Sequence, residues 1–211
     1  MIAIIDYGVG NIASIHNMLR KIGVDSVLTS NVDEIKNADR LILPGVGAFD
    51  ACAIKLRSSG LLDILDDTAH HARKPILGIC VGLQLLFEGS EEGKEPGLNW
   101  VKGKVVRFQP SRMKETLKIP HMGWSDVEAR QTHPLAEGLQ QESRFYFVHS
   151  YHAQVNDEND ILFAAEYGYT FPAAVCHHHI AGVQFHPEKS HRFGMQLLSN
   201  FAQWQPSVEY V

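Results

Sequence analysis

The chain has 211 residues, of which 45% are hydrophobic, and its formal net charge is −5. This length and composition can bury one substantial core, so we expect a single domain over residues 1–211. The acidic balance argues against nucleic acid or an anionic membrane as a partner. Three cysteines without C-x-x-C spacing indicate a reducing compartment, and the apolar run at residues 1–6 is too short for a signal peptide, so we expect a cytoplasmic protein.

The first half of the sequence alternates apolar runs with segments of helical spacing. We predict strands at residues 2–6, 26–29 and 41–43 and just before Cys80, and helices at residues 12–22, 49–56 and 61–72. This alternation is typical of an α/β fold with a parallel sheet and helices on both faces. In such folds the active site lies at the carboxyl ends of the strands.

Beyond residue 89 the pattern changes to short β-like runs, which indicate an antiparallel extension of the sheet. We predict these runs at residues 100–108, 124–127, 145–148, 162–167, 173–177 and 180–185, followed by a closing helix at residues 192–204. Residues 89–97 and 154–160 are polar and charged, so we expect loops there.

The loop after the first strand, residues 8–13, reads GVGNIA and fits the G-x-G-x-x-A pattern of dinucleotide-binding folds. That pattern also requires an acidic residue at the end of the second strand, where this chain has Leu28-Thr29-Ser30. An NAD-dependent oxidoreductase is therefore disfavoured as an alternative, because the chain lacks the acidic residue that would bind the ribose. Asn11 can instead cap the helix that follows.

Residues 44–49, PGVGAF, follow a buried strand. Glycines at the carboxyl end of a strand let backbone N–H groups turn into a crevice, where those of Val46 and Gly47 could hold an oxyanion with the N–H of Val81. Taken alone, the segment is better explained as an ordinary strand-to-helix turn.

The segment Gly78-Ile79-Cys80-Val81-Gly82 is the thiol counterpart of the G-x-S-x-G nucleophile elbow. The flanking glycines allow the strained backbone of such a turn and the close approach of neighbouring elements. A helix beginning at Val81 would place its positive end beside the sulfur and favour the thiolate. Cys80 is thus a candidate nucleophile, although most free cysteines are small core residues.

A second candidate group lies at His186-Pro187-Glu188, after a β-like run. The residue before proline favours extended geometry, in which side chains two apart leave the same side of the backbone, so we expect His186 and Glu188 to meet. A histidine oriented by an acid is the general base of Cys-His-acid catalysis.

These three segments resemble, in this order and over nearly the whole chain, the triad-type (class I) glutamine amidotransferases. Five segments are similar to the glutaminase subunit of imidazole glycerol phosphate synthase, namely IDYGVGN (5–11), PGVGAF (44–49), PHMGW (120–124), FYFVHSY (145–151) and HPEKS (186–190). The chain departs from that family at Ser125, where an asparagine is usual.

The resemblance implies a flavodoxin-like or Rossmann-like amidotransferase fold, without cofactor or metal. It implies hydrolysis of glutamine through a thioester on Cys80, with His186 as base and Glu188 orienting it. The ammonia would pass to a cyclase subunit in a heterodimer, which uses it to convert a nucleotide substrate into imidazole glycerol phosphate and aminoimidazole carboxamide ribotide in histidine biosynthesis. By the same resemblance, glutamine is held by Gly45, Gln84, Ser150 and Tyr151, and the partner is contacted by Gly8, Asn11, Met122 and Trp124.

Two alternatives of other kinds remain open. The chain could serve a different synthase, such as those for anthranilate or pyridoxal phosphate, or it could be a regulatory module that has lost activity.

The run His177-His178-His179 suggests a metal site, but consecutive residues in a strand point to opposite faces, so at most the first and third could share an ion.

Overall fold

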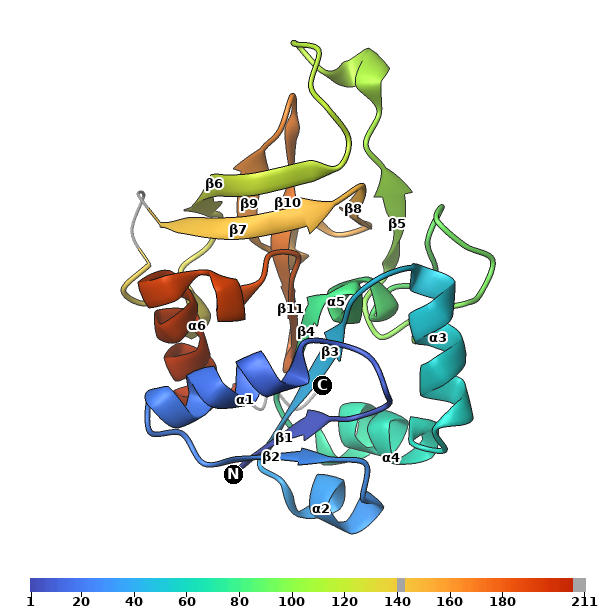
Figure 1. Ribbon diagram of the computed structural model, residues 1–211, viewed down its shortest axis with the longest axis vertical. Helices are drawn as coiled ribbons and strands as arrows, with labels where there is room; N and C mark the ends of the chain where they lie inside the picture. Colours follow the sequence, from blue (N-terminus) through green and yellow to red (C-terminus); the bar gives the residue numbers. More distant parts are fainter. Residues whose placement is uncertain (140–142, 207–211) are drawn as a thin grey trace.

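The computed structural model describes residues 1–139 and 143–206. Its centre is a nine-stranded mixed sheet with the order β2-β1-β3-β4-β11-β10-β9-β6-β7 (Figure 1). Five neighbouring strands are parallel: β2 (Ser26–Thr29), β1 (Ile2–Ile5), β3 (Arg40–Gly45), β4 (Ile76–Cys80) and β11 (Ile180–Val183). Four antiparallel strands extend them: β10 (Thr170–His177), β9 (Ile161–Glu166), β6 (His121–Ala129) and β7 (Arg144–His149).

Helices cover both faces of the parallel part of the sheet. The helices α1 (Ile12–Lys21) and α6 (His191–Gln203) contact each other on one side, and α3 (Phe49–Ser58), α4 (Leu62–Asp67) and α5 (Val81–Leu85) lie on the other (Figure 1). Every residue of β1, β4 and β11 is buried, as expected for parallel strands covered on both faces. The predicted α/β fold with an antiparallel extension is confirmed.

Several elements differ from the sequence-based prediction. The helix α2 (Val32–Asn37) was not expected, although Asn31 caps it by accepting hydrogen bonds from the N–H groups of Asp33 and Glu34 at 2.8 and 3.2 Å. The expected helix at residues 61–72 is divided into α4 and a π-helical turn, Thr68–Ala72. Short 3₁₀ turns lie at Pro110–Arg112, Pro134–Ala136, Glu158–Asp160 and Pro187–Lys189.

A second small sheet was also missed. The strand β5 (Gly103–Arg107) pairs with β8 (Tyr151–Val155) in an antiparallel ribbon, so the loop expected from residue 154 begins later. The expected cap at Asn11 takes another form, because its side chain makes no bond to the helix backbone and instead accepts a 2.8 Å hydrogen bond from the Ser14 hydroxyl.

The strand order brings together three segments that are far apart in the sequence. β4 lies between β3 and β11, so the carboxyl ends of all three strands meet at one edge of the sheet. In this register Gly45 pairs with Cys80, and Val183 pairs with Ile79. Within the described residues, no helix is both long and apolar enough to span a membrane.

Candidate active site

Cys80 stands at the sharp turn between β4 and α5. Its backbone has φ 56° and ψ −113°, a left-handed conformation that L side chains rarely adopt. A Cβ on Gly82 would collide with the carbonyl oxygen of Leu43, and one on Gly78 would lie 2.7 Å from the carbonyl oxygen of Gly82. The two glycines therefore permit the close packing that forms the elbow.

His186 lies between Cys80 and Glu188. Nδ1 of His186 donates a 2.8 Å hydrogen bond to Oε1 of Glu188, and the ring and the Cys80 thiol line the same cavity. Burial lowers the pKa of His186, but the interactions with the neighbouring Cys80 and Glu188 outweigh it and raise the pKa to about 9. The site thus favours an imidazolium beside the sulfur.

The expected contact between His186 and Glu188 is present, but the expected reason for it was wrong. Glu188 lies in the 3₁₀ turn Pro187–Lys189, not on an extended strand. Ser190 holds this turn, because its hydroxyl donates to the His186 carbonyl at 2.6 Å and accepts from the Tyr146 N–H at 3.0 Å. Sequence reasoning did not assign a role to Ser190.

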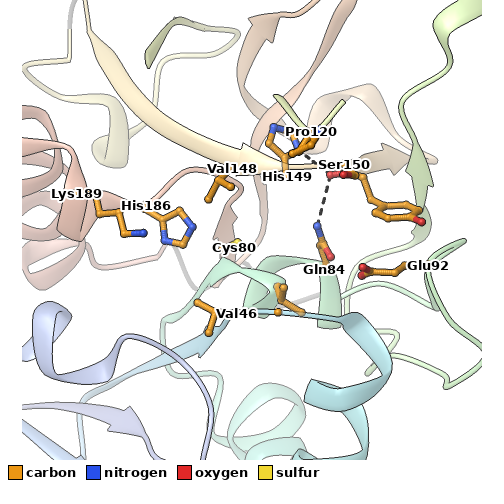
Figure 2. A pocket seen from close by; sticks show the side chains of 13 residues that line it. Val46, Cys80, Gln84, Glu92, Pro120, Val148, His149, Ser150, His186 and Lys189 are labelled. Atoms are coloured by element: carbon orange, nitrogen blue, oxygen red, sulfur yellow. Dashed lines mark hydrogen bonds between the residues drawn. The ribbon is translucent and has the colours of Figure 1, made fainter. Parts of the chain in front are cut away.

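A cavity of about 350 Å³ opens in front of the thiol (Figure 2). It is lined by Val46, Gly47, Cys80, Val81, Gln84, Glu92, Pro120, Val148, His149, Ser150, Tyr151, His186 and Lys189. Predicted catalytic, oxyanion and substrate residues thus gather around one space. Gly45 does not line it and packs instead against the start of α5, where a Cβ would lie 2.6 Å from the Gly82 nitrogen.

The loop that follows β3 turns at the mouth of this cavity. Gly47 has φ +90°, which favours glycine. The Val46 carbonyl accepts a hydrogen bond from the Cys52 thiol at 3.3 Å. Because the C=O and N–H of one trans peptide point in opposite directions, the Gly47 N–H points away from Cys52.

Two glutamines are hydrogen-bonded beneath the thiol. Nε2 of Gln84 donates to Oε1 of Gln184 at 3.1 Å and to the Tyr151 carbonyl at 3.5 Å. Nε2 of Gln184 in turn lies 3.9 Å from the Cys80 sulfur. Oε1 of Gln84 is buried without a hydrogen-bond partner among the described residues, which leaves an acceptor for a ligand. Gln184 follows the buried β11, and only its position in the fold reveals this role.

Glu92 is the carboxylate that sequence reasoning missed. It lies in the polar segment 89–97, lines the cavity, and accepts a 2.9 Å hydrogen bond from the Phe49 N–H at the start of α3. No motif marks this glutamate in the sequence, because neighbouring acidic residues of the same segment look alike.

The four expected partner contacts lie outside the cavity lining. Met122 and Trp124 are 62% and 40% exposed on β6, next to the cavity-lining Pro120. The Trp124 ring stacks on His191 with a centroid separation of 5.5 Å. Gly8 is exposed and Asn11 is half-buried in the loop that follows β1.

The histidine run does not converge on one point. His177 bonds to Asp160 at 2.9 Å, whereas His179 bonds to the Ala69 carbonyl at 2.7 Å. In the part of the chain that the structure describes, no group of three or more His, Cys, Asp or Glu side chains is arranged to hold a metal ion.

The comparisons with known proteins agree with this geometry. The family model described as glutamine amidotransferase class-I matches residues 3–204. The chain is 50% identical over 203 residues to the imidazole glycerol phosphate synthase subunit HisH 2 of Pseudomonas aeruginosa, covering 96% of this chain and 99% of that protein. It is also 50% identical to the HisH subunit of Sulfurimonas denitrificans, covering 97% of this chain and 99% of that protein.

The similar solved structures are less than 25% identical to this chain and support its fold only. A structure described as a glutamine amidotransferase superposes with a TM-score of 0.73 at 18% identity, over 95% of this chain and 97% of that chain. The structure of PurLQS from Thermotoga maritima also gives a TM-score of 0.73, at 16% identity over 96% of this chain and 97% of that chain. With the family model and the near full-length relatives, these likenesses show that the chain belongs to the class-I glutamine amidotransferases and, within them, to the HisH subunits of imidazole glycerol phosphate synthase.

Proposed function

We propose that this chain is a single glutaminase domain that hydrolyses glutamine and passes the ammonia to a cyclase subunit, which makes imidazole glycerol phosphate in histidine biosynthesis. The observation that carries the proposal is that Cys80 and His186 line one cavity of about 350 Å³, with the His186 ring held from behind by Glu188. The cavity has the size and the polar lining that a free amino acid requires.

The reaction proceeds in two halves at Cys80. His186 takes the thiol proton, and the thiolate attacks the side-chain amide carbon of glutamine. The oxyanion accepts hydrogen bonds from the N–H of Val81 and from the loop at Val46 and Gly47. His186 then gives its proton to the departing nitrogen, which leaves as ammonia, and the γ-glutamyl thioester remains.

The second half releases glutamate. Water attacks the thioester carbon while His186 takes a proton from it, and the C–S bond breaks. The new carboxyl group of glutamate gives its remaining proton to solvent as the product leaves, and the proton on His186 returns to the Cys80 thiolate as the site resets. Glu188 holds the imidazole in the tautomer that both halves need.

The amino-acid end of glutamine meets the opposite wall of the cavity. The Glu92 carboxylate and the partnerless Oε1 of Gln84 are both acceptors suited to the α-ammonium group. The backbone around Ser150 and Tyr151 lines the same wall and is our candidate for the α-carboxylate.

The partner surface is the exposed pair Met122 and Trp124 with the loop that contains Gly8 and Asn11. We also propose a cytoplasmic location, which the three free cysteines support. Release of glutamate from glutamine, with Cys80→Ala as control, tests the glutaminase. Synthesis of imidazole glycerol phosphate from glutamine by the reconstituted pair tests the partner. Glutamate release without any dependence on the cyclase would contradict the assignment to this synthase.

A further inference from the structure

A line of polar side chains extends from the active site, through the buried His149 and His121, to the half-buried Ser125 on β6. His121 and His149 are paired residues on β6 and β7, and their Nδ1 and Nε2 atoms lie 3.0 Å apart. Nε2 of His121 lies 2.9 Å from the Ser125 hydroxyl. Nδ1 of His149 lies 2.7 Å from the carbonyl oxygen of Tyr151. None of these contacts is needed to form the triad.

The direction of every hydrogen bond in this line can be assigned. The Tyr151 carbonyl can only accept, so Nδ1 of His149 carries its proton and Nε2 of His149 accepts. Nδ1 of His121 must then donate, which leaves Nε2 of His121 as an acceptor. The Ser125 hydroxyl is the donor that completes the line.

Both rings are held neutral, which this assignment requires. Burial lowers the pKa of His121 to about 4. Burial also holds the pKa of His149 well below its usual value. A neutral imidazole has one donor and one acceptor nitrogen, so the tautomer of each ring is decided by its neighbours.

The line ends at the carbonyl that orients Gln84. The dashed bonds in Figure 2 converge on this oxygen from His149 and from Gln84. With its NH₂ group occupied by Tyr151 and Gln184, the Gln84 amide keeps Oε1 as the free acceptor. A rotated Tyr151 carbonyl would release the amide and remove this preference.

We propose that Ser125 is a positioning residue for the substrate, acting through the hydrogen-bonded rings of His121 and His149 on the Tyr151 carbonyl and the Gln84 amide. This role rests on the proposed glutaminase function. Ser125 follows Trp124 in β6, and its side chain points to the opposite face, toward His121, so the line begins directly behind the candidate partner surface.

The test compares Ser125→Ala with Ser125→Thr, which keeps the hydroxyl. Loss of one hydrogen bond at the far end of the line should raise KM for glutamine by about threefold to tenfold, while kcat changes by less than about twofold. Ser125→Thr should restore KM. Ser26→Ala is the matched control, because the Ser26 hydroxyl is buried without a partner in the described part of the chain and should leave both constants unchanged.

Ring ¹⁵N spectra of the unliganded chain give a readout that does not require activity. In the wild type, His149 and His121 should both be Nδ1–H tautomers, and Ser125→Ala should shift the Nε2 resonance of His121, which loses its hydrogen-bond donor. An unchanged KM together with unchanged ring spectra in Ser125→Ala would overturn the proposal, as would a Ser125→Thr variant as impaired as Ser125→Ala. A wild type without glutaminase would instead contradict the proposed function, whatever the spectra show.

Discussion

Nδ1 of His186 donates a hydrogen bond to Oε1 of Glu188, and the two side chains are only 3% and 1% exposed. Because Nδ1 is occupied by Glu188, Nε2 is the ring nitrogen that remains to exchange a proton with the Cys80 thiol. Glu188 thus orients the imidazole ring from one side, and the other side of the ring is available to the Cys80 sulfur. Reactivity at Cys80 depends on this arrangement and on the walls of the adjoining cavity.

Replacing Cys80 by alanine should abolish glutamine-dependent synthesis, because the thiolate is the group that forms the acyl intermediate. The partner's ammonia-dependent reaction should remain at high ammonium concentration and alkaline pH. Burial raises the pKa of Cys176 to about 12, so Cys176→Ser should stay active and serves as the control. The measurement is product formation with glutamine and with ammonium. Residual glutaminase above a trace in Cys80→Ala would show that the nucleophile is elsewhere.

Cys52→Ser should also keep glutaminase activity. Burial raises the pKa of the Cys52 thiol, so this cysteine is not poised to attack. A serine hydroxyl can still donate to the Val46 carbonyl, as the thiol does at 3.3 Å. A glutamine-analogue electrophile should therefore form one adduct, on Cys80, in both the wild type and this variant. Mass spectrometry of the labelled peptide distinguishes the sites, and an adduct on Cys52 would contradict the assignment.

Replacing Glu188 by glutamine should lower kcat with a smaller change in KM. The variant keeps the shape of the side chain but removes the charge that stabilises the imidazolium, a loss of roughly 10⁴-fold in serine triads. Steady-state glutaminase kinetics in the presence of the cyclase partner with its nucleotide ligand measure the effect. Glu128→Gln, an exposed glutamate on β6, is the control. Equal turnover in the two variants would mean that His186 is oriented by another group.

Sequence patterns predicted the parts of the molecule whose backbone geometry and reactive residue are specified by the same short motif. The elbow around Cys80 could be predicted because the close packing around the turn requires glycine at fixed positions, Gly78 and Gly82. The short helix α2 was missed because its six residues carry little periodicity, and Asn31 was not recognised as a cap. The ribbon of β5 and β8 depends on pairing between segments far apart in the sequence, which no local pattern encodes.

The substrate wall was harder to predict than the triad for a similar reason. Glu92 and Gln184 reach the site only because α3 and β11 place them there, and their own segments have no distinguishing motif. His186 and Glu188 were paired correctly, but through a 3₁₀ turn that local propensity did not indicate. Tertiary packing, not local preference, decides these positions.

Replacing Glu92 by glutamine should raise KM for glutamine by roughly 10-fold to 100-fold, because a charge-assisted hydrogen bond to the α-ammonium group is lost. The cap on α3 should survive, since the glutamine Oε1 can still accept from the Phe49 N–H. Glu88→Gln, an exposed neighbour that does not line this cavity, is the matched control. Glutaminase kinetics over a range of glutamine concentrations measure KM. An unchanged KM in Glu92→Gln would place the ammonium elsewhere.

Stability should be greatest near neutral pH. The pKa of His186 is raised to about 9, so between pH 6.5 and 9 the folded state binds more protons than the unfolded state, and stability falls as pH rises. The pKa of His121 is lowered to about 4, so between pH 6.5 and 4 the unfolded state binds more protons, and stability falls as pH drops. Urea unfolding of the wild type at about pH 5, 7 and 9 measures both slopes. His186→Gln should lose the alkaline decline and keep the acid one, and an equal alkaline decline in this variant would assign it to another group.

Glutamate release by the isolated chain should be slow and should rise when the cyclase partner with its nucleotide ligand is bound. The loop at Val46 and Gly47 is the candidate switch, because a peptide between glycines can rotate at modest cost and present an N–H to the oxyanion. Val46→Pro removes one of these N–H groups and should depress the stimulated rate far more than the basal one, whereas Val46→Ala keeps the N–H and should retain stimulation.

The measurement of this switch is glutamate release by the chain alone, with the partner, and with the partner and its ligand. The bond from the Cys52 thiol to the Val46 carbonyl holds the next peptide in place, so rotation is confined to the peptide that carries the Val46 N–H. Stimulation should therefore survive in Cys52→Ser, which retains a donor, and should weaken in Cys52→Ala. Equal rates under all three conditions in the wild type would contradict the coupling between partner and oxyanion loop, and would indicate a glutaminase that acts on its own.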